Sequence, residues 1–433
     1  MHKRVQSVRL LVVLSALAQF AGFAPGDIVD EWNNEALNAI KALPPGPPSI
    51  SRKLAMMHIA MYDANNATTG ARRSYMPIPQ GVPVGASGQA AAAQAAHDVL
   101  VSLFPERAAI FNERLASQLS LMPANQARAD GLSVGATCGA ACFNLRATDG
   151  ATAPSSWTQR NLPTSWRPTG ASPVPLFNQY AHVTPWTMST RSQFRQSAPP
   201  LPGSPEFQAA YDEVKAIGSA TSAIRTVDQT NIAKFWAGGN GTVTPPGQWN
   251  LIAQTVSAAQ GTGFDDKLRL FALLNMAEAD AAVVAWDMKY TYDYFRPITA
   301  IRQMEDPTWT PLLGTPQFQA YSSGHSIFSA SGAAVLADFY SDNIAFDLTL
   351  TDASLGIFDM TRSYTSFTQA AAEAGQSRMY GGIHWQFDNT ASLQAGALLG
   401  NHISDNFLAV PTPGAALVLA FGGIIVSRRR RSA

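Results

Sequence analysis

Two cationic side chains occur in largely apolar surroundings in the stretch WDMKYTYDYFRP. Lys289 and Arg296 are seven residues apart, which on a continuous helix is two turns and places both side chains on one face. Cations in apolar surroundings need something negative against them. The partner is either a bound anion or a nearby carboxylate, such as Asp287 or Asp293, and the spacing alone leaves both alternatives open.

A second group of polar residues stands where a loop enters a helix, in YSSGHSIFSASGAAVLADFY, which begins at Tyr321. The first backbone N–H groups of a helix are unpaired and point outward, so this position favours an anion. Ser323 can donate a hydrogen bond, Gly324 lets the backbone come close, and His325 can act as acid or base. The alternative is a serine N-cap followed by a buried histidine.

A third group surrounds a glycine pair in GQSRMYGGIHWQFDNTASL. The glycines permit a sharp turn, so Arg378 and His384 need not lie on one helix. Asp388 follows His384 by one helical turn. Its carboxylate can accept from one imidazole nitrogen and leave the other as an acceptor or a ligand. An ion pair and a helix cap are the alternative.

Together, two arginines, a lysine, a helix N-terminus and two histidines are the groups that bind a tetrahedral oxyanion. In order they read Lys-x6-Arg-Pro, Ser-Gly-His and Ser-Arg-x5-His, within residues 286–388. This pattern resembles the signature of the vanadium haloperoxidase and type 2 phosphatidic acid phosphatase superfamily. Trp286, Phe318 and the run HWQFD resemble its soluble, chloroperoxidase-like branch, whereas Ser322 stands where the family usually has proline.

The resemblance implies vanadate as the cofactor and assigns a role to each matching residue. His384 would be the axial ligand to the vanadium, and His325 would transfer protons as peroxide binds and water leaves. The vanadate oxygens would be held by five groups: Lys289, Arg296, Arg378, Ser323 and the backbone N–H of Gly324.

Further residues would support this set. Asp388 would orient the axial histidine, while Trp286 and Phe318 would line the vanadate pocket. Arg378 needs a carboxylate of its own, for which Asp228 is the candidate.

The activity that the resemblance implies is oxidation of a halide by hydrogen peroxide to a hypohalous species, which would react with a small organic acceptor. The halide could be chloride, bromide or iodide. Because phosphate and vanadate have nearly the same shape, an acid phosphatase that hydrolyses phosphomonoesters through a phosphohistidine at His384 is the alternative. A helical domain with an inactive pocket is a second alternative, which the complete ligand set disfavours.

The elements that must position these residues are helical, because apolar residues recur at helical spacing through most of the chain. The expected helical segments are 27–43, 51–67, 87–104, 106–122, 124–147, 205–218, 227–238, 247–260, 264–294, 325–341 and 366–405. Alternating strand patterns are nearly absent. The sequence therefore predicts an all-α, large helical-bundle domain over residues 25–408, with a long Pro/Trp-rich excursion at 149–205 draped over the bundle.

The two ends differ from this body. Residues 1–24 combine basic residues, an apolar run and small residues, which is typical of a secretory signal peptide. Residues 410–433 resemble the PEP-CTERM sorting tags of bacteria, although Thr412 stands where those tags usually have Glu. We therefore expect an exported bacterial protein, at the cell surface or secreted, that contacts a membrane only through this C-terminal segment.

Charge and cysteine content exclude other classes of protein. The chain has 30 basic and 30 acidic residues, but the two ends hold seven basic and no acidic ones, which leaves 23 basic against 30 acidic residues in the body. This balance disfavours nucleic acid as a partner. Cys138 and Cys142, one helical turn apart, are expected to be two small buried residues rather than a disulfide.

Overall fold

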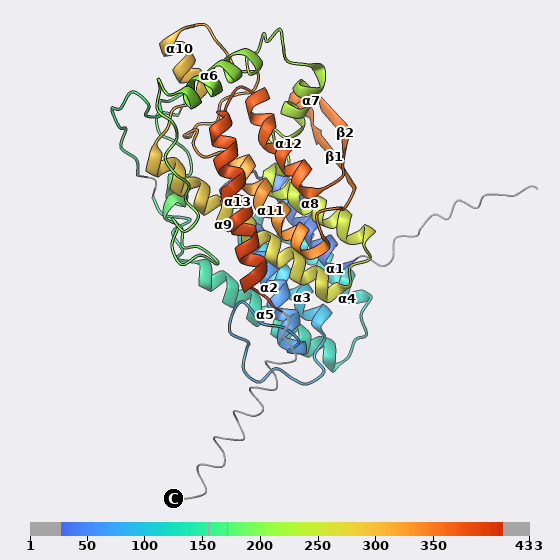
Figure 1. Cartoon of the computed structure of the whole chain (residues 1–433). Helices are drawn as coiled ribbons and strands as arrows, with labels where there is room; N and C mark the ends of the chain where they lie inside the picture. The colour runs from blue at the N-terminus through green and yellow to red at the C-terminus, as the bar shows by residue number, and fades with distance from the viewer. Residues whose placement is uncertain (1–26, 155, 171, 410–433) are drawn as a thin grey trace, which may run out of the picture.

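The computed structural model describes residues 27–154, 156–170 and 172–409 (Figure 1). The predicted signal peptide and C-terminal sorting segment lie outside these residues. The described part of the chain is mostly helical, which confirms the predicted fold class. None of its helices is long and apolar enough to cross a bilayer.

Thirteen α-helices occur in the described ranges. The first five are α1 (Ile28–Ala42), α2 (Pro47–Thr69), α3 (Gly88–Leu103), α4 (Ala108–Ser120) and α5 (Gln126–Arg146). The others are α6 (Pro205–Ile217), α7 (Val227–Phe235), α8 (Thr244–Ala259), α9 (Phe264–Tyr292), α10 (Pro297–Met304), α11 (Gly324–Tyr340), α12 (Phe367–Tyr380) and α13 (Gln386–Asn406).

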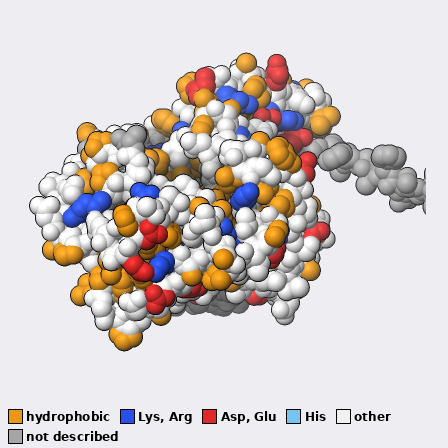
Figure 2. Space-filling view, turned by 90° about the horizontal axis from the view of Figure 1, so that it is seen from above, with side chains coloured by type: hydrophobic (Ala, Val, Ile, Leu, Met, Phe, Trp, Pro, Cys, Tyr) orange, Lys and Arg blue, Asp and Glu red, His pale blue; other side chains and the backbone are white. Residues whose placement is uncertain are grey.

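On the face above α6, α7 and α10, basic and acidic side chains are interspersed rather than gathered by sign (Figure 2).

Helix α9 forms the centre of the bundle, with α2, α8, α11 and α13 packed around it (Figure 1). Almost every side chain from Lys267 to Lys289 is buried. A helix that is apolar on all faces gains most from burial when other helices surround it. The C-terminal end of α9 is thereby fixed in the interior, which is where Lys289 lies.

Helices α11 and α13 pack closely against each other because glycines occur at their contact. A Cβ atom on Gly396 would lie 2.4 Å from the Ile327 carbonyl oxygen, and one on Gly400 would lie 2.6 Å from that of Ser331. No larger residue fits at either position without moving the helices apart. This contact fixes the N-terminal ends of α11 and α13 relative to each other.

The described residues of the Pro/Trp-rich excursion lie over the bundle, as predicted. The buried Asp280 carboxylate on α9 accepts hydrogen bonds from the backbone N–H groups of Trp186 and Thr187, at 2.7 and 2.8 Å. Arg195 forms two hydrogen bonds, of 2.6 and 2.7 Å, with the carboxylate of Asp287. Buried carboxylates of the central helix therefore hold a segment that has little regular structure of its own.

Two predicted helical segments differ from the observed ones. Helix α9 ends at Tyr292, because Asp293 adopts a left-handed conformation with φ 48°. Arg296 is the N-cap of α10, so Lys289 and Arg296 do not share a helix, and the prediction that they lie on one helical face is wrong. The predicted segment 366–405 is broken into α12 and α13 by the turn at Gly381 and Gly382.

An antiparallel hairpin, β1 (Phe346–Asp352) and β2 (Ile357–Tyr364), was not predicted. Buried and exposed residues alternate along β1, so the pattern is present in the sequence FDLTLTD, but it is short and isolated among helices. Both cysteines are buried with free thiols, as expected.

Glu278 is a buried carboxyl group in the middle of α9. It is fully buried, and neither of its carboxyl oxygens has a hydrogen-bond partner within the described residues. Burial raises the pKa of Glu278 well above its usual value of 4.5. Below pH 4.5 the carboxyl group is protonated in both the folded and the unfolded protein, so its contribution to stability is complete. As the pH rises from there toward the folded-state pKa, the group ionises only in the unfolded protein, and the free energy of unfolding falls.

We expect Glu278→Gln to stabilise the protein relative to wild type increasingly as the pH rises, because glutamine cannot ionise on unfolding. One such group changes the free energy of unfolding by up to about 1.4 kcal/mol per pH unit. Urea unfolding at about pH 5 and about pH 8 measures the effect, with Glu113→Gln, an exposed glutamate on α4, as the control. The same difference from wild type at both pH values would contradict the prediction.

Candidate active site

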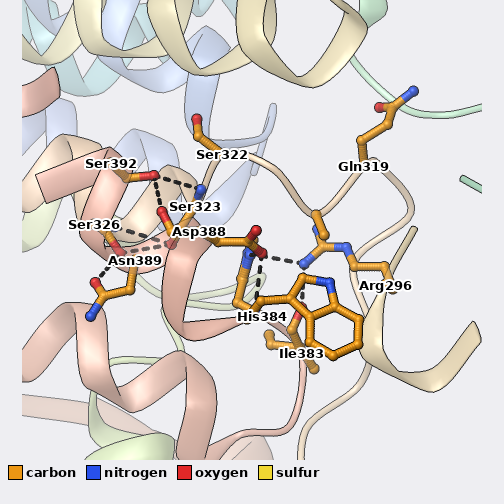
Figure 3. Close-up of polar contacts among 12 residues, drawn as sticks. Arg296, Gln319, Ser322, Ser323, Ser326, Ile383, His384, Asp388, Asn389 and Ser392 are labelled. Atoms are coloured by element: carbon orange, nitrogen blue, oxygen red, sulfur yellow. Dashed lines mark hydrogen bonds and ion pairs between the residues drawn. The ribbon is translucent and has the colours of Figure 1, made fainter. Parts of the chain in front are cut away.

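Three segments that are distant in the sequence meet at the C-terminal end of α9. They are the turn from α9 to α10, the loop that enters α11, and the turn between α12 and α13 (Figure 3). The last turn depends on Gly382, which has φ 75° and whose Cβ would lie 2.2 Å from the Gly218 carbonyl oxygen. The turn places Ile383 and His384 in the interior.

Lys289 is fully buried and its ammonium group points at backbone carbonyl groups. The Nζ donates to the carbonyl oxygens of Gln319, at 2.8 Å, and of Ser322. Burial lowers the pKa of Lys289 well below its usual range, and the nearby Arg296 lowers it further. The loop before α11 is therefore joined directly to the end of α9.

Arg296 is also fully buried, and one of its nitrogens has no partner. Its Nε donates to the Phe318 carbonyl oxygen at 2.7 Å, and its Nη1 donates to that of Ile383 at 2.7 Å. The Nη2 atom has no hydrogen-bond partner in the described structure. Burial lowers the pKa of Arg296 to about 9.

Arg378 is 3% exposed, and its guanidinium group has more nitrogens without a hydrogen-bond partner than that of Arg296. Its Nε and Nη1 atoms both lack hydrogen-bond partners within the described residues, and burial lowers its pKa to about 9. The predicted partnership with Asp228 is wrong, because the Asp228 carboxylate pairs with Arg362 at 2.8 Å near the surface. A buried cation with free donors needs an anion, and the described residues supply none to Arg378.

His384 is held by Asp388, as expected from their spacing. The Nδ1 of His384 lies 2.8 Å from Asp388 Oδ2, which also accepts from the Trp385 backbone N–H at 3.1 Å (Figure 3). Since a carboxylate oxygen accepts, Nδ1 carries the proton and Nε2 keeps its lone pair. Arg296 Nη1 lies 2.9 Å from that Nε2.

The pKa values of this pair reflect the same surroundings. Burial, reinforced by the cations around it, lowers the pKa of His384 well below its usual range. Burial raises the pKa of Asp388 to about 7, against the opposing effects of the Trp385 backbone N–H and of Lys289 and Arg296. The imidazole is therefore neutral, and its Nε2 lone pair accepts from Arg296, a bond that an electrophilic atom would replace.

Ser323 is the N-cap of α11 and connects it to α13. Its backbone N–H donates to the Ser392 hydroxyl oxygen at 2.8 Å, and Ser392 in turn donates to the Asp388 carbonyl oxygen at 2.6 Å (Figure 3). The Ser323 hydroxyl accepts from the Ser326 backbone N–H at 3.3 Å. It also lies 2.8 Å from the Ser326 hydroxyl, which donates its one proton to Asn389 Oδ1, so the Ser323 hydroxyl is the donor to that of Ser326. Gly324 is the first residue of the helix, where the backbone N–H has no intrahelical acceptor.

His325 faces the loop between α7 and α8. Its Nε2 lies 3.0 Å from the Ala237 carbonyl oxygen and must donate to it, which leaves Nδ1 as the acceptor in the neutral ring. Burial lowers the pKa of His325 well below its usual range, and Arg378 lowers it further. Such a neutral imidazole can accept a proton and return it.

An aromatic wall adjoins the cations. The rings of Trp286 and Phe318 are 5.2 Å apart, and Lys289 Nζ lies 4.9 Å from the centre of the Phe318 ring. Leu176 and Phe177 of the excursion support this wall, since Trp286 Nε1 donates to the Leu176 carbonyl oxygen at 3.3 Å. Sequence reasoning missed these two residues and Ser392, because no motif or periodicity marks them.

The arrangement suits an oxyanion. Among the described residues, Asp388 is the carboxylate that opposes two arginines and a lysine, and several of their donors have no partner. The start of α11 adds a partial positive charge. A separate cavity of about 520 Å³ between α6 and α13 is lined by Glu206 and Glu213 and by no cationic side chain. That cavity would repel an anion, so the candidate site is the cationic cluster.

Comparisons with known proteins agree with this geometry. Residues 269–410 match the family described as the VCPO second helical-bundle domain. The chain is 24% identical to the vanadium chloroperoxidase of Curvularia inaequalis over 279 residues, which are 49% of this chain and 46% of that protein. The chain thus spans about half the length of this curated relative.

Solved structures extend the likeness to most of the fold. A bacterial vanadium-dependent iodoperoxidase matches with a TM-score of 0.81 and 25% identity, over 90% of this chain and 99% of that one. A holo-type bacterial vanadium-dependent chloroperoxidase matches with a TM-score of 0.68 and 16% identity, over 84% and 92% of the two chains. The chain is therefore similar to vanadium haloperoxidases and has their helical fold.

The free donors of Arg378 lead to a prediction about stability. We expect Arg378→Met to raise the free energy of unfolding of the ligand-free protein by roughly 0.5–2 kcal/mol, because it removes a buried charge with no carboxylate partner. The same variant should lose binding of inorganic phosphate, measured by calorimetry. Urea unfolding measures the stability change.

Arg146→Met is the matched control, because Arg146 is equally buried but bonds Asp149 at 2.9 Å and the Thr184 carbonyl oxygen. Its loss should lower the free energy of unfolding by roughly 2–4 kcal/mol. Destabilisation of similar size in both variants would show that Arg378 has a structural role instead.

Proposed function

We propose that this protein is a vanadate-dependent haloperoxidase, which uses hydrogen peroxide to oxidise a halide to a hypohalous species. The observation that carries the proposal is the buried cage of Lys289, Arg296 and Arg378, with free guanidinium donors, beside a neutral His384 whose unprotonated Nε2 points at this cage. Its relatives among the vanadium haloperoxidases support the choice of anion.

The residues of the cage fit vanadate. The oxygens would be held by Lys289, Arg296, Arg378, the Ser323 hydroxyl and the Gly324 backbone N–H, and the metal by Nε2 of His384. When bound, vanadate supplies Lewis-acid activation of the peroxide. The cations of the chain hold the negative charge in a dry site, where their donors are already oriented.

The two histidines have different tasks in this proposal. Asp388 accepts from Nδ1 of His384, which fixes the tautomer and directs Nε2 toward the anion. The Ala237 carbonyl oxygen fixes His325 in the opposite tautomer, so that its Nδ1 takes up the proton of incoming peroxide and returns it to departing water. His384 therefore serves binding, and His325 serves proton transfer.

The aromatic wall supports a halide as the substrate. Trp286 and Phe318 lie next to the cations but offer no hydrogen-bond acceptor to them, so a weakly hydrated anion can approach without competition. A small organic acceptor would then consume the hypohalous product.

The division of labour between the histidines can be tested. We expect His384→Ala to weaken vanadate binding by more than the roughly 10–100-fold seen when a residue that only orients a ligand is removed. His325→Ala should keep most of the affinity but lower bromination of a phenol dye by roughly 10²–10⁴-fold. Calorimetry with vanadate and a steady-state assay with peroxide and bromide measure the two effects separately.

The same lone pair on His384 could attack phosphorus, so a phosphatase is the competing function. Hydrolysis of p-nitrophenyl phosphate without vanadate, abolished by His384→Ala, together with no bromination in the presence of vanadate, would overturn the haloperoxidase proposal. Chloride, bromide and iodide compared in the same assay would establish the halide.

We further propose that the protein is exported and acts outside the cytoplasm. The support is the sequence of residues 1–24 and of the PEP-CTERM-like residues 410–433. Mass spectrometry of the protein from its host would test this, since export predicts a mature N-terminus after the signal peptide. Retention of Met1 would contradict it.

A further inference from the structure

Three tyrosine hydroxyl groups converge on one short piece of the excursion. Tyr292 donates to the Gln196 carbonyl oxygen at 2.5 Å, and Tyr321 donates to that of Ser197 at 2.6 Å. Tyr294 donates to the Pro200 carbonyl oxygen at 2.5 Å. Residues 196–200, here called the strap, belong to no helix or strand, so these bonds replace a secondary-structure ladder.

All three tyrosines lie within three residues, in sequence, of a residue that builds the anion cage. Tyr292 is the last residue of α9, and Tyr294 lies in the turn that leads from Lys289 to Arg296. Tyr321 directly precedes Ser322 and Ser323 in the loop that enters α11. The strap therefore touches two of the three segments that build the cage.

The tyrosine rings also make aromatic contacts. The rings of Tyr292 and Tyr321 are 5.4 Å apart in a T-shaped arrangement, and that of Tyr294 lies 5.8 Å from Phe387. Tyr294 and Tyr321 are each 2% exposed. Buried hydroxyl groups need partners, and here the strap supplies them.

The position of Tyr321 bears directly on Lys289. Lys289 Nζ donates to the carbonyl oxygens of Gln319, Ala320 and Ser322, which are the residues on either side of Tyr321. A shift of Tyr321 moves these acceptors and, with them, the lysine and the N-cap Ser323. A displacement of this kind changes anion affinity even though no ligand is removed.

We infer that the strap, through its hydrogen bond with the Tyr321 hydroxyl group, sets the geometry of the oxyanion cage. This inference rests on the proposed function in so far as the cage binds vanadate or phosphate. Tyr321 contacts no anion itself. It is a positioning residue that holds the Ser322–Gly324 backbone against Lys289.

The test is Tyr321→Phe, which removes one hydroxyl group and keeps the ring. Loss of one ordinary hydrogen bond shifts an equilibrium by roughly 3–10-fold, and we expect the dissociation constants for vanadate and for inorganic phosphate to rise by that factor. Turnover at saturating vanadate should change little, whereas amide hydrogen exchange at residues 322–326 of the ligand-free protein should become faster.

Tyr75→Phe is the matched control, because the Tyr75 hydroxyl donates to the Trp186 carbonyl oxygen at 2.8 Å, elsewhere in the same excursion. It should lower the melting temperature as Tyr321→Phe does, without changing anion affinity or exchange at 322–326. Equal exchange at 322–326 in Tyr321→Phe and wild type would overturn the inference. A wild-type protein that binds no vanadate would refute the proposed function. The exchange comparison at residues 322–326 would still test the role of Tyr321, because it is measured without ligand.

Discussion

The structure depends on keeping three like charges buried close together. Lys289, Arg296 and Arg378 lie in the interior with Asp388 as the carboxylate among them, and removing such ions from water is costly. Backbone carbonyl oxygens compensate two of the three cations, because they carry partial negative charge without adding a competing anion. The remaining donors keep an excess of positive potential for a ligand.

This requirement explains why the acceptors of Lys289 and Arg296 lie in turns and loops rather than inside a helix. Carbonyl groups inside a helix are already bonded, so only segments that leave regular structure can offer theirs to a buried cation. The left-handed Asp293 ends α9 and starts the turn to Arg296, and Gly382 brings the Ile383 carbonyl oxygen to the same guanidinium. The close α11–α13 contact then fixes the distance between the two histidine-bearing segments.

The sequence predicted the residue types of the site better than their arrangement. Local motifs identified Lys289, Arg296 and Arg378, because an apolar context makes cations conspicuous. The prediction that Lys289 and Arg296 share one helix was wrong, because the end of α9 depends on a single left-handed residue, Asp293. Asp228 failed as a partner because a choice among distant carboxylates depends on tertiary structure. Most helices followed from periodicity, whereas the short helix α10 and the short hairpin did not stand out.

Supports contributed from far away in the chain could not be predicted, and they have a common physical character. The Leu176 and Ala237 carbonyl oxygens, like those of the strap, act through the backbone, and any residue type provides a carbonyl group. Such contacts leave no mark in the sequence at the accepting position, only at the donor. A tyrosine that directly precedes a site motif, such as Tyr321, is therefore the part of this support that a sequence can reveal.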